Sequence, residues 1–152
     1  IPGFLAFREV PVILRAFKEL RKDNFIPDVV LFDGHGIAHP RKLGIASHAG
    51  VLLGTPTIGV AKSKLYGFCD IPTQPGEATY VTDKSGNIIG YCYLSKPKVK
   101  PIFISPGHLC DVESSLRFVK SITKHYRLPE PTRIAHLYSQ RIKKELRSKT
   151  NI

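Results

Sequence analysis

The fold of this chain follows from residues 28–36, Asp28-Val29-Val30-Leu31-Phe32-Asp33-Gly34-His35-Gly36. The apolar run that ends at Phe32 follows a proline, and such a run is typical of a buried central strand. The two glycines after it predict a turn or loop. Residues 57–61 form a second apolar run behind another proline, and residues 43–53 between the runs predict a short helix that ends at a glycine. Strand, helix and strand in this order predict a mixed α/β sheet flanked by helices.

Further elements complete one domain. A helical stripe of apolar residues covers 7–21, but Pro11 fits only a first turn, so we expect the helix to begin near Val10 with Glu9 at its N-terminus. A hairpin is predicted over 78–82 and 88–94, a short strand over 102–104, and helices over 111–125, with Asp111 as N-cap, and 132–147. The 152 residues suit a single core, which we place at 1–147 with a frayed tail at 148–152.

The charge balance favours a polyanionic partner. The chain carries 23 Lys and Arg against 12 Asp and Glu, a formal net charge of +11, and such a field attracts nucleic acid. A merely soluble basic protein is the alternative. An anionic membrane is not supported as a partner, because the sequence shows no long apolar run and no basic amphipathic helix with a bulky apolar face. Cys69, Cys92 and Cys110 show no CxxC spacing, which indicates free thiols in a reducing compartment.

Asp33 is the most informative candidate for chemistry. A carboxylate directly after a buried strand lies at the carboxyl edge of the sheet, where α/β proteins bind ligands, and Gly34 and Gly36 would let a ligand approach the backbone. Lys62, after the second strand, and Ser105, after the third, are expected at the same rim. The alternatives are an aspartate that caps a tight turn and a lysine that is merely solvated at a strand end.

Glu9 extends this rim into a hypothetical metal site. If helix 7–21 packs beside strand 28–32, Glu9 comes close to Asp33, and two carboxylates that share a site call for a cation such as Mg²⁺ or Mn²⁺. That ion would bind a phosphate oxygen and activate water. The helix macrodipole alone also explains a glutamate at a helix start.

The other polar candidates are histidines and cations. His39 and Arg41 follow the glycine loop, where a phosphate would suit the local positive charge, and His136 lies alone among apolar residues on the last helix. The histidine spacing matches no zinc pattern, and a half-buried structural histidine is the alternative for His136. No Walker loop, GxGxxG or GxSxG motif is present, which leaves triphosphate, dinucleotide and serine-hydrolase functions without support.

Several blocks, in the right order, resemble the endonuclease V family. Ile1-Pro2-Gly3-Phe4-Leu5-Ala6-Phe7-Arg8-Glu9 resembles the segment in which a Tyr-Ile-Pro-Gly turn leads to an essential Glu. Asp33-Gly34-His35-Gly36-Ile37-Ala38-His39-Pro40-Arg41 resembles the DG-x-G-x-x-HPR block of the family. Residues 43–51, 59–65 and 105–108 match further segments, so the resemblance covers essentially the whole chain.

The resemblance implies an RNase H-like fold and a DNA-repair nuclease that uses Mg²⁺, or Mn²⁺ in its place, to hydrolyse the second phosphodiester bond 3′ to a deoxyinosine. Glu9 and Asp33 would hold the metal, Lys62 would stabilise the scissile phosphate, and His136 would lie near the metal. The deaminated base would be flipped out of the stack into a pocket. The residues implied for base and nucleic-acid binding are Leu5, Gly34, Gly36, His39, Arg41, Gly44, Ile45, His48, Leu65 and Ser105.

The chain also departs from the family pattern. The family's first essential Asp and its wedge tyrosine lie upstream of the segment in which this chain begins, at Ile1. We therefore expect a fragment, or a gene start placed too late, that lacks the first strands of the sheet. The complete protein, and not this fragment, would then carry out the cleavage.

Two other functions stay open. A non-cleaving module that binds inosine in DNA or RNA is the main alternative. A related RNase H-like incision nuclease of nucleotide-excision repair is disfavoured by the HPR block and by the segment around Glu9. We expect a cytoplasmic monomer whose partner is DNA, with inosine-containing RNA as a second candidate and no membrane partner.

Overall fold

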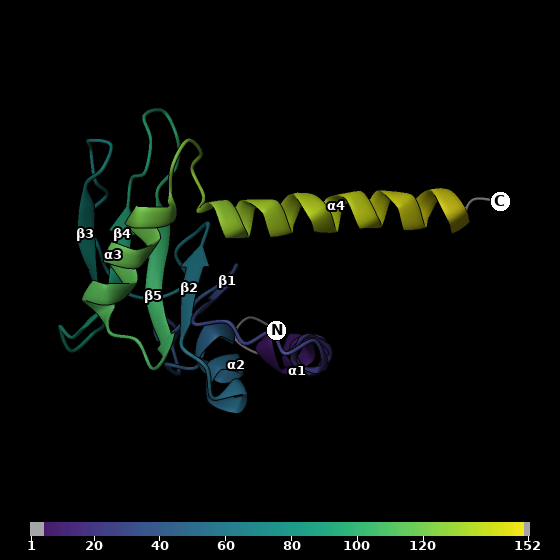
Figure 1. The fold of residues 1–152 in the computed structure, drawn as a ribbon. Coiled ribbons are helices and arrows are strands. Elements are labelled where there is room, and N and C mark those ends of the chain that lie inside the picture. The colour runs from purple at the N-terminus through teal and green to yellow at the C-terminus, as the bar shows by residue number, and fades with distance from the viewer. Residues whose placement is uncertain (1–4, 151–152) are drawn as a thin grey trace.

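The computed structural model describes residues 5–150, and the side chains of residues 7–149. Within these residues the strands are β1 (Val30–Phe32), β2 (Thr57–Ala61), β3 (Ala78–Thr82), β4 (Ile88–Tyr93) and β5 (Ile102–His108). The helices are α1 (Leu5–Lys22), α2 (Ile45–Leu53), α3 (Val112–Ile122) and α4 (Glu130–Thr150). The strands form one mixed sheet in the order β1-β2-β5-β4-β3 (Figure 1). The predicted α/β class is confirmed.

The predicted strand–helix–strand unit is present at one edge of the sheet. β1 and β2 are parallel neighbours, with Phe32 opposite Gly59. α2 connects them and ends at Gly54, whose φ of 64° lies in the left-handed region that favours glycine. The two strands therefore present their carboxyl ends at the same edge, as expected for a parallel pair.

The third strand differs from its prediction. The Pro106-Gly107 pair suggested a strand end after residue 104, but β5 continues to His108 and runs antiparallel to β2. A register shift opposite Thr57 and Ile58 accommodates the proline as a bulge. Ser105 consequently pairs with Gly59 in mid-strand. The prediction that Ser105 lies at a strand end on the common rim is wrong.

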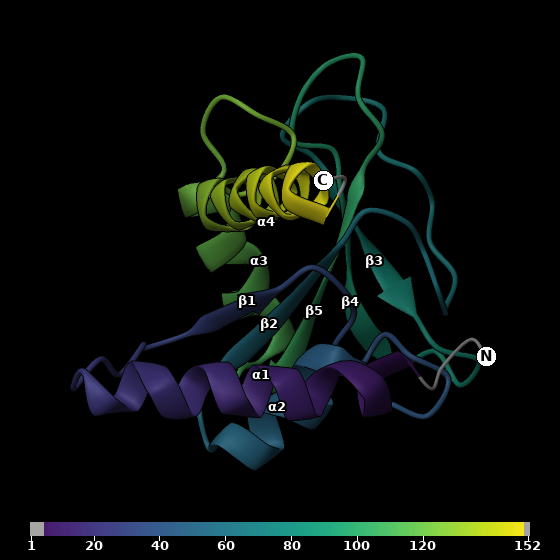
Figure 2. The same ribbon diagram turned by 90° about the vertical axis from the view of Figure 1, so that its right-hand side faces the viewer.

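Two layers cover the faces of the sheet. α3 packs on one face, where Val119 joins Ile58, Val60, Tyr93, Ile102 and Ile104 in a buried cluster. α2 and the loop that follows β1 cover the other face, and Ala38 and Phe103 are buried there. Figure 2 shows α1 crossing α2 on this side of the molecule. The Asp111 side chain accepts a hydrogen bond from the amide of Ser114, which confirms it as the N-cap of α3.

α1 begins earlier than the sequence predicted. Pro11 lies inside the helix, not in its first turn, and Glu9 is already helical. Buried Val10 packs with Phe32, Ala46, Ala49 and Leu53 of β1 and α2. Tertiary packing of this apolar face outweighs the local preference of proline for a helix start, because most helix stability in a protein comes from such packing.

α4 is longer than predicted. It continues through Thr150, so the predicted frayed tail is helical at residues 148–150, and 151–152 lie outside the described residues. Figure 1 shows that α4 projects away from the body of the molecule. Every side chain from Ile134 to Lys149 is exposed.

Candidate active site

Asp33 and Lys62 meet at the carboxyl ends of β1 and β2. Lys62 Nζ donates a hydrogen bond to Asp33 Oδ2 over 2.5 Å, and both side chains are partly exposed, Lys62 at 37% and Asp33 at 50%. An exposed ion pair adds little to stability. Its significance is therefore its position, which places a carboxylate and an ammonium side by side where solvent can reach both.

Arg127 anchors the backbone beneath Lys62. One nitrogen of its guanidinium, Nη2, donates to the carbonyl oxygens of Lys62, at 2.8 Å, and of Pro101, at 2.9 Å. Nε donates to the carbonyl oxygen of Lys100 at 2.7 Å. Sequence reasoning missed this residue because no motif marks it. Only the approach of its segment to the end of β2 in the fold gives it this role.

The glycine loop is held against β5. The Gly36 amide donates to Ser105 Oγ at 2.8 Å, and the Ile37 amide donates to the Pro106 carbonyl at 2.8 Å. A Cβ at Gly36 would lie 1.9 Å from that same carbonyl oxygen. The prediction that Gly36 lets a ligand approach the backbone is wrong. The space beside its Cα is filled by the backbone of β5. Ser105 is only 1% exposed, so it positions the loop instead of contacting nucleic acid as predicted.

The start of α2 is joined to the same loop. The Gly44 amide donates to the Gly36 carbonyl at 3.0 Å, and the Ala46 amide donates to the His35 carbonyl at 3.0 Å. A Cβ at Gly44 would lie 2.2 Å from the His35 carbonyl oxygen, and one at Gly34 would lie 2.7 Å from the Ile45 side chain. Gly34 and Gly44 therefore shape the wall of the site by close packing, beside half-buried Ile45.

His39 and Arg41 have different environments. His39 is 4% exposed, and its Nδ1 accepts the backbone amide of Arg41 at 3.2 Å. Burial, and next the charge of Arg41, lower the pKa of His39, so its ring is neutral at physiological pH. His39 is thus a buried support of the loop, whereas Arg41 is exposed at the surface.

Three buried polar atoms around α2 have no hydrogen-bond partner among the described residues: His35 Nδ1, Ser47 Oγ and His48 Nδ1. His35 Nε2 lies 3.0 Å from the Ser63 carbonyl oxygen, so it is the protonated nitrogen, and burial lowers the pKa of this histidine. The His48 ring packs edge-on against Phe7 with centroids 5.0 Å apart. His48 was a predicted site residue, whereas the sequence singled out neither His35 nor Ser47, although His35 stands inside the quoted motif.

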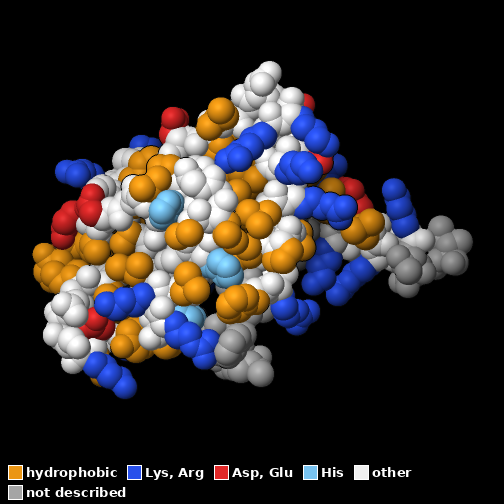
Figure 3. All heavy atoms as spheres, turned by 90° about the horizontal axis from the view of Figure 1, so that it is seen from below, with side chains coloured by type: hydrophobic (Ala, Val, Ile, Leu, Met, Phe, Trp, Pro, Cys, Tyr) orange, Lys and Arg blue, Asp and Glu red, His pale blue; other side chains and the backbone are white. Residues whose placement is uncertain are grey.

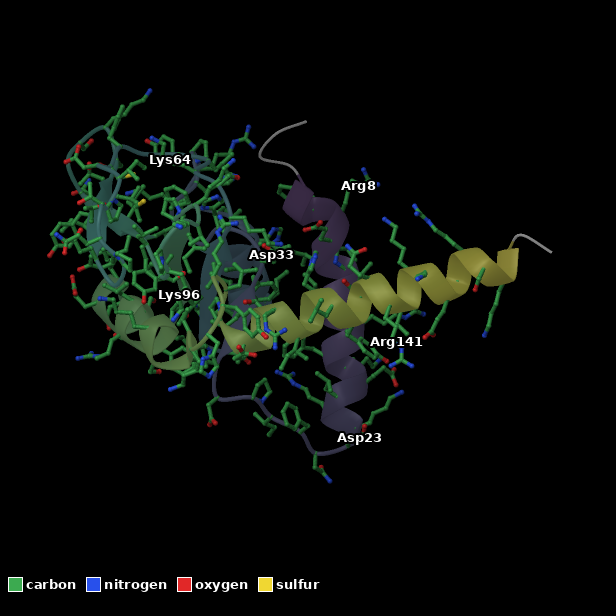
Figure 4. The ribbon with its side chains drawn as sticks, turned by 90° about the horizontal axis from the view of Figure 1, so that it is seen from above. Arg8, Asp23, Asp33, Lys64, Lys96 and Arg141 are labelled. Carbon is green, nitrogen blue, oxygen red and sulfur yellow. The ribbon has the colours of Figure 1, made fainter. Side chains whose placement is uncertain are left out.

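A cavity of about 470 Å³ brings Asp33 and His136 together. Apolar side chains of α1, β1, α3 and α4, among them Phe17, Leu31 and Phe118, make most of its wall, and Asp33 and His136 are its charged or titratable lining residues. Figure 4 shows Asp33 to one side of the point where α4 crosses α1 in this view. The structure therefore brings the late histidine and the candidate carboxylate to the wall of one cavity, and a role for His136 at a metal site stays a prediction.

Glu9 lies on the exposed side of α1, next to buried Val10. Since Val10 packs with Phe32, which precedes Asp33, the predicted packing of α1 beside β1 is present. The described residues contain no cluster of three or more His, Cys, Asp or Glu side chains suited to a metal ion. Glu9 lines a hollow with Arg8, Val12 and Ile13, whereas Asp33 lines the cavity of His136, so a Mg²⁺ site shared by the two carboxylates stays a prediction.

The remaining predicted residues lie at the periphery. Leu65 is 44% exposed after β2. The side chain of Leu5, like residues 1–4 of the quoted N-terminal block, lies outside the described part of the chain. Burial raises the pKa of the Cys92 thiol to about 12, which disfavours a nucleophilic thiolate there. Within the described residues, no helix is both long and apolar enough to cross a bilayer.

Comparisons with known proteins agree on one family. The family model described as Endonuclease V matches residues 1–137. The Endonuclease V of Kosmotoga olearia is 47% identical over 145 residues, which cover 95% of this chain and 63% of that protein. The chain thus spans a little under two thirds of the length of this curated relative.

Solved structures give the same result. The Endonuclease V of Bacillus subtilis has a TM-score of 0.88 and 38% identity, over 98% of this chain and 63% of that one. The Endonuclease V of Ciona intestinalis, solved in complex with a 24mer DNA containing an inosine followed by a ribo-adenosine, has a TM-score of 0.84 and 34% identity, over 96% and 68% of the two chains. These structures confirm the predicted RNase H-like fold class.

Proposed function

The chain belongs to the endonuclease V family, and on this premise we propose that it acts in a metal-dependent nuclease that hydrolyses the second phosphodiester bond 3′ to a deoxyinosine in DNA, or to an inosine in RNA. The observation that carries the proposal is the Asp33–Lys62 pair at adjoining strand ends, beside a cavity that His136 also lines. The DNA complex of the Ciona relative supports inosine-containing nucleic acid as the partner.

Asp33 and Glu9 would hold a Mg²⁺ ion, with Mn²⁺ as a substitute, because hard carboxylate oxygens select these cations. When bound, the ion would polarise a phosphate oxygen and lower the pKa of a bound water. Lys62 would turn from Asp33 towards the scissile phosphate and stabilise the charge that develops on it. The free energy needed to separate Lys62 from Asp33 is small because the ion pair is partly exposed.

The wall beside this site would receive the flipped base. Half-buried Ile45 offers apolar surface next to Gly34, and exposed Leu65 offers further apolar surface after β2. Arg41, exposed on the loop that follows β1, would contact the backbone of the nucleic acid.

The proposal is tested by Asp33→Asn in the complete protein. We would measure Mg²⁺-dependent nicking of a duplex that contains one deoxyinosine, and binding of the same duplex without metal. Asp33→Asn should abolish nicking and retain binding, whereas Asp23→Asn, an exposed control at the far end of α1 (Figure 4), should cut like the parent. Unchanged cutting by Asp33→Asn would remove the proposed site. Specific binding by a parent that never cuts would favour the non-cleaving inosine-binding module.

A further inference from the structure

The outer part of α4 is a basic segment that the family match does not include. The match ends at residue 137, whereas α4 runs to Thr150. Between these points the helix carries five Lys and Arg residues and one Glu. Lys and Arg side chains gather at the end of the molecule towards which α4 projects, at the right of Figure 3.

Two of these cations continue the line of His136. Residues seven and eleven positions apart fall on the same side of an α-helix, so His136, Lys143 and Arg147 form one row, here called the basic stripe. Ser139, one step round the helix, lines both the cavity of Asp33 and the hollow between α1 and α4 that Lys143 and Arg147 also line. The basic stripe therefore begins at the candidate active site and leads outward along α4.

The charges of the basic stripe have no counter-ion within the described residues. The ion pair on this part of α4 joins Arg141 to Glu145, with Nε and Oε1 2.9 Å apart, on another side of the helix. Lys143 and Arg147 form no ion pair with any residue that the structure describes. From His136 to Arg147 the stripe rises about 16 Å at 1.5 Å per residue. That length matches about five nucleotide steps of duplex DNA at 3.4 Å each.

We propose that Lys143 and Arg147 bind phosphates of the nucleic-acid strand that leaves the candidate active site. This inference rests on the proposed function, because the direction of the basic stripe has meaning only if a phosphodiester occupies the cavity beside Asp33. An anionic membrane is the rival partner, since Tyr138, Ile142 and Leu146 form an exposed apolar row beside the stripe. Nucleic acid is favoured because the basic stripe is continuous with the cavity. Binding to a bilayer surface would not depend on that alignment.

Salt dependence of binding tests the proposal in the full chain. Each phosphate contact contributes about 0.9 to the slope of log Kobs against log salt concentration. Lys143→Gln/Arg147→Gln should therefore lower the slope by about 1.8 for a fluorescent duplex, measured by anisotropy without metal, with or without an inosine. Glutamine is a good helix former, so these exposed substitutions preserve α4.

The matched control is Arg141→Gln/Lys149→Gln, which removes the same charges from the opposite side of α4. It should keep most of the parental slope. Equal losses in both variants, or no loss in either, would overturn the proposal. So would a stripe variant that loses affinity for vesicles of anionic phospholipid while it binds the duplex normally. Nicking by the parent and Asp33→Asn reports on the proposed function separately, because binding without metal does not require the catalytic site to work.

Discussion

The ammonium of Lys62 lies 2.5 Å from the carboxylate of Asp33, although 29 positions separate the two residues in the chain. The contact follows from the parallel pairing of β1 and β2, which ends both strands at one edge of the sheet. A carboxylate that can hold a cation and an ammonium that can meet a phosphate are thereby available at one point. Arg127 holds the backbone at this point through its hydrogen bond to the Lys62 carbonyl.

Replacing Lys62 by methionine should slow cleavage more than it weakens binding. Methionine keeps the unbranched shape and most of the length of the side chain but removes the charge that would stabilise the transition state. The expected loss is about 10²–10³ in kcat, as for a single donor of this kind. Single-turnover nicking of the inosine duplex measures the effect. Lys64→Met, at an exposed position two residues on, is the control and should cut within about twofold of the parent. A Lys62→Met enzyme as fast as its control would contradict a role for Lys62 at the phosphate.

Ser105→Ala should destabilise the protein by about 1–3 kcal/mol, because it leaves the buried Gly36 amide without an acceptor. Urea unfolding of both proteins gives the difference. Ser85→Ala, on an exposed hairpin turn, is the control and should change stability by less than about 0.5 kcal/mol. Equal stability of the two variants would show that the hydrogen bond to Gly36 is unimportant.

Gly36→Ala should be more damaging, since the new Cβ would lie 1.9 Å from the Pro106 carbonyl oxygen and only a backbone shift can relieve the contact. We expect a loss of about 1–3 kcal/mol or more and slower nicking, because the loop carries Asp33. Gly76→Ala provides the comparison, since nothing lies within 4 Å of its Cβ position and only its positive φ of 90° opposes the change. A Gly36→Ala protein more stable than Gly76→Ala would refute the close approach of loop and strand.

Acid should destabilise the fold partly through His39. Burial, and then Arg41, lower the folded-state pKa of this histidine below its ordinary value of 6.5. Between the two pKa values, His39 is therefore protonated in the unfolded chain and neutral in the folded chain. The free energy of unfolding falls as the pH decreases from about 7 through 6.5 towards the folded pKa, and the loss due to His39 is complete below that value. His35, whose pKa is lowered mainly by burial, acts in the same direction.

The difference in unfolding free energy between about pH 7.5 and about pH 5.5 should accordingly be smaller in His39→Gln than in the parent. His125→Gln, at an exposed histidine, should keep the parental difference. If His39→Gln retained all of the pH dependence and His125→Gln lost it, the buried neutral state of His39 would be excluded.

Several elements could be predicted from local sequence signals. The apolar runs at β1 and β2, with a glycine-ended helix between them, specify a parallel strand pair, and the carboxyl ends of such a pair must meet. Asp33 and Lys62 could therefore be predicted as neighbours from the order of the residues alone. The turn residues of the β3–β4 hairpin and the Asp111 cap of α3 are local signals of the same kind.

Where local signals compete with packing, the outcome depends on contacts between distant segments. Pro11 lies inside α1 because the face with Val10 is buried against α2 and β1, and β5 passes through Pro106-Gly107 because pairing with β2 compensates for the bulge. Ser105 and Arg127 owe their roles to partners 69 and 65 positions away, Gly36 and Lys62. No local pattern records such contacts, because their free energy depends on where distant segments are placed by the finished sheet.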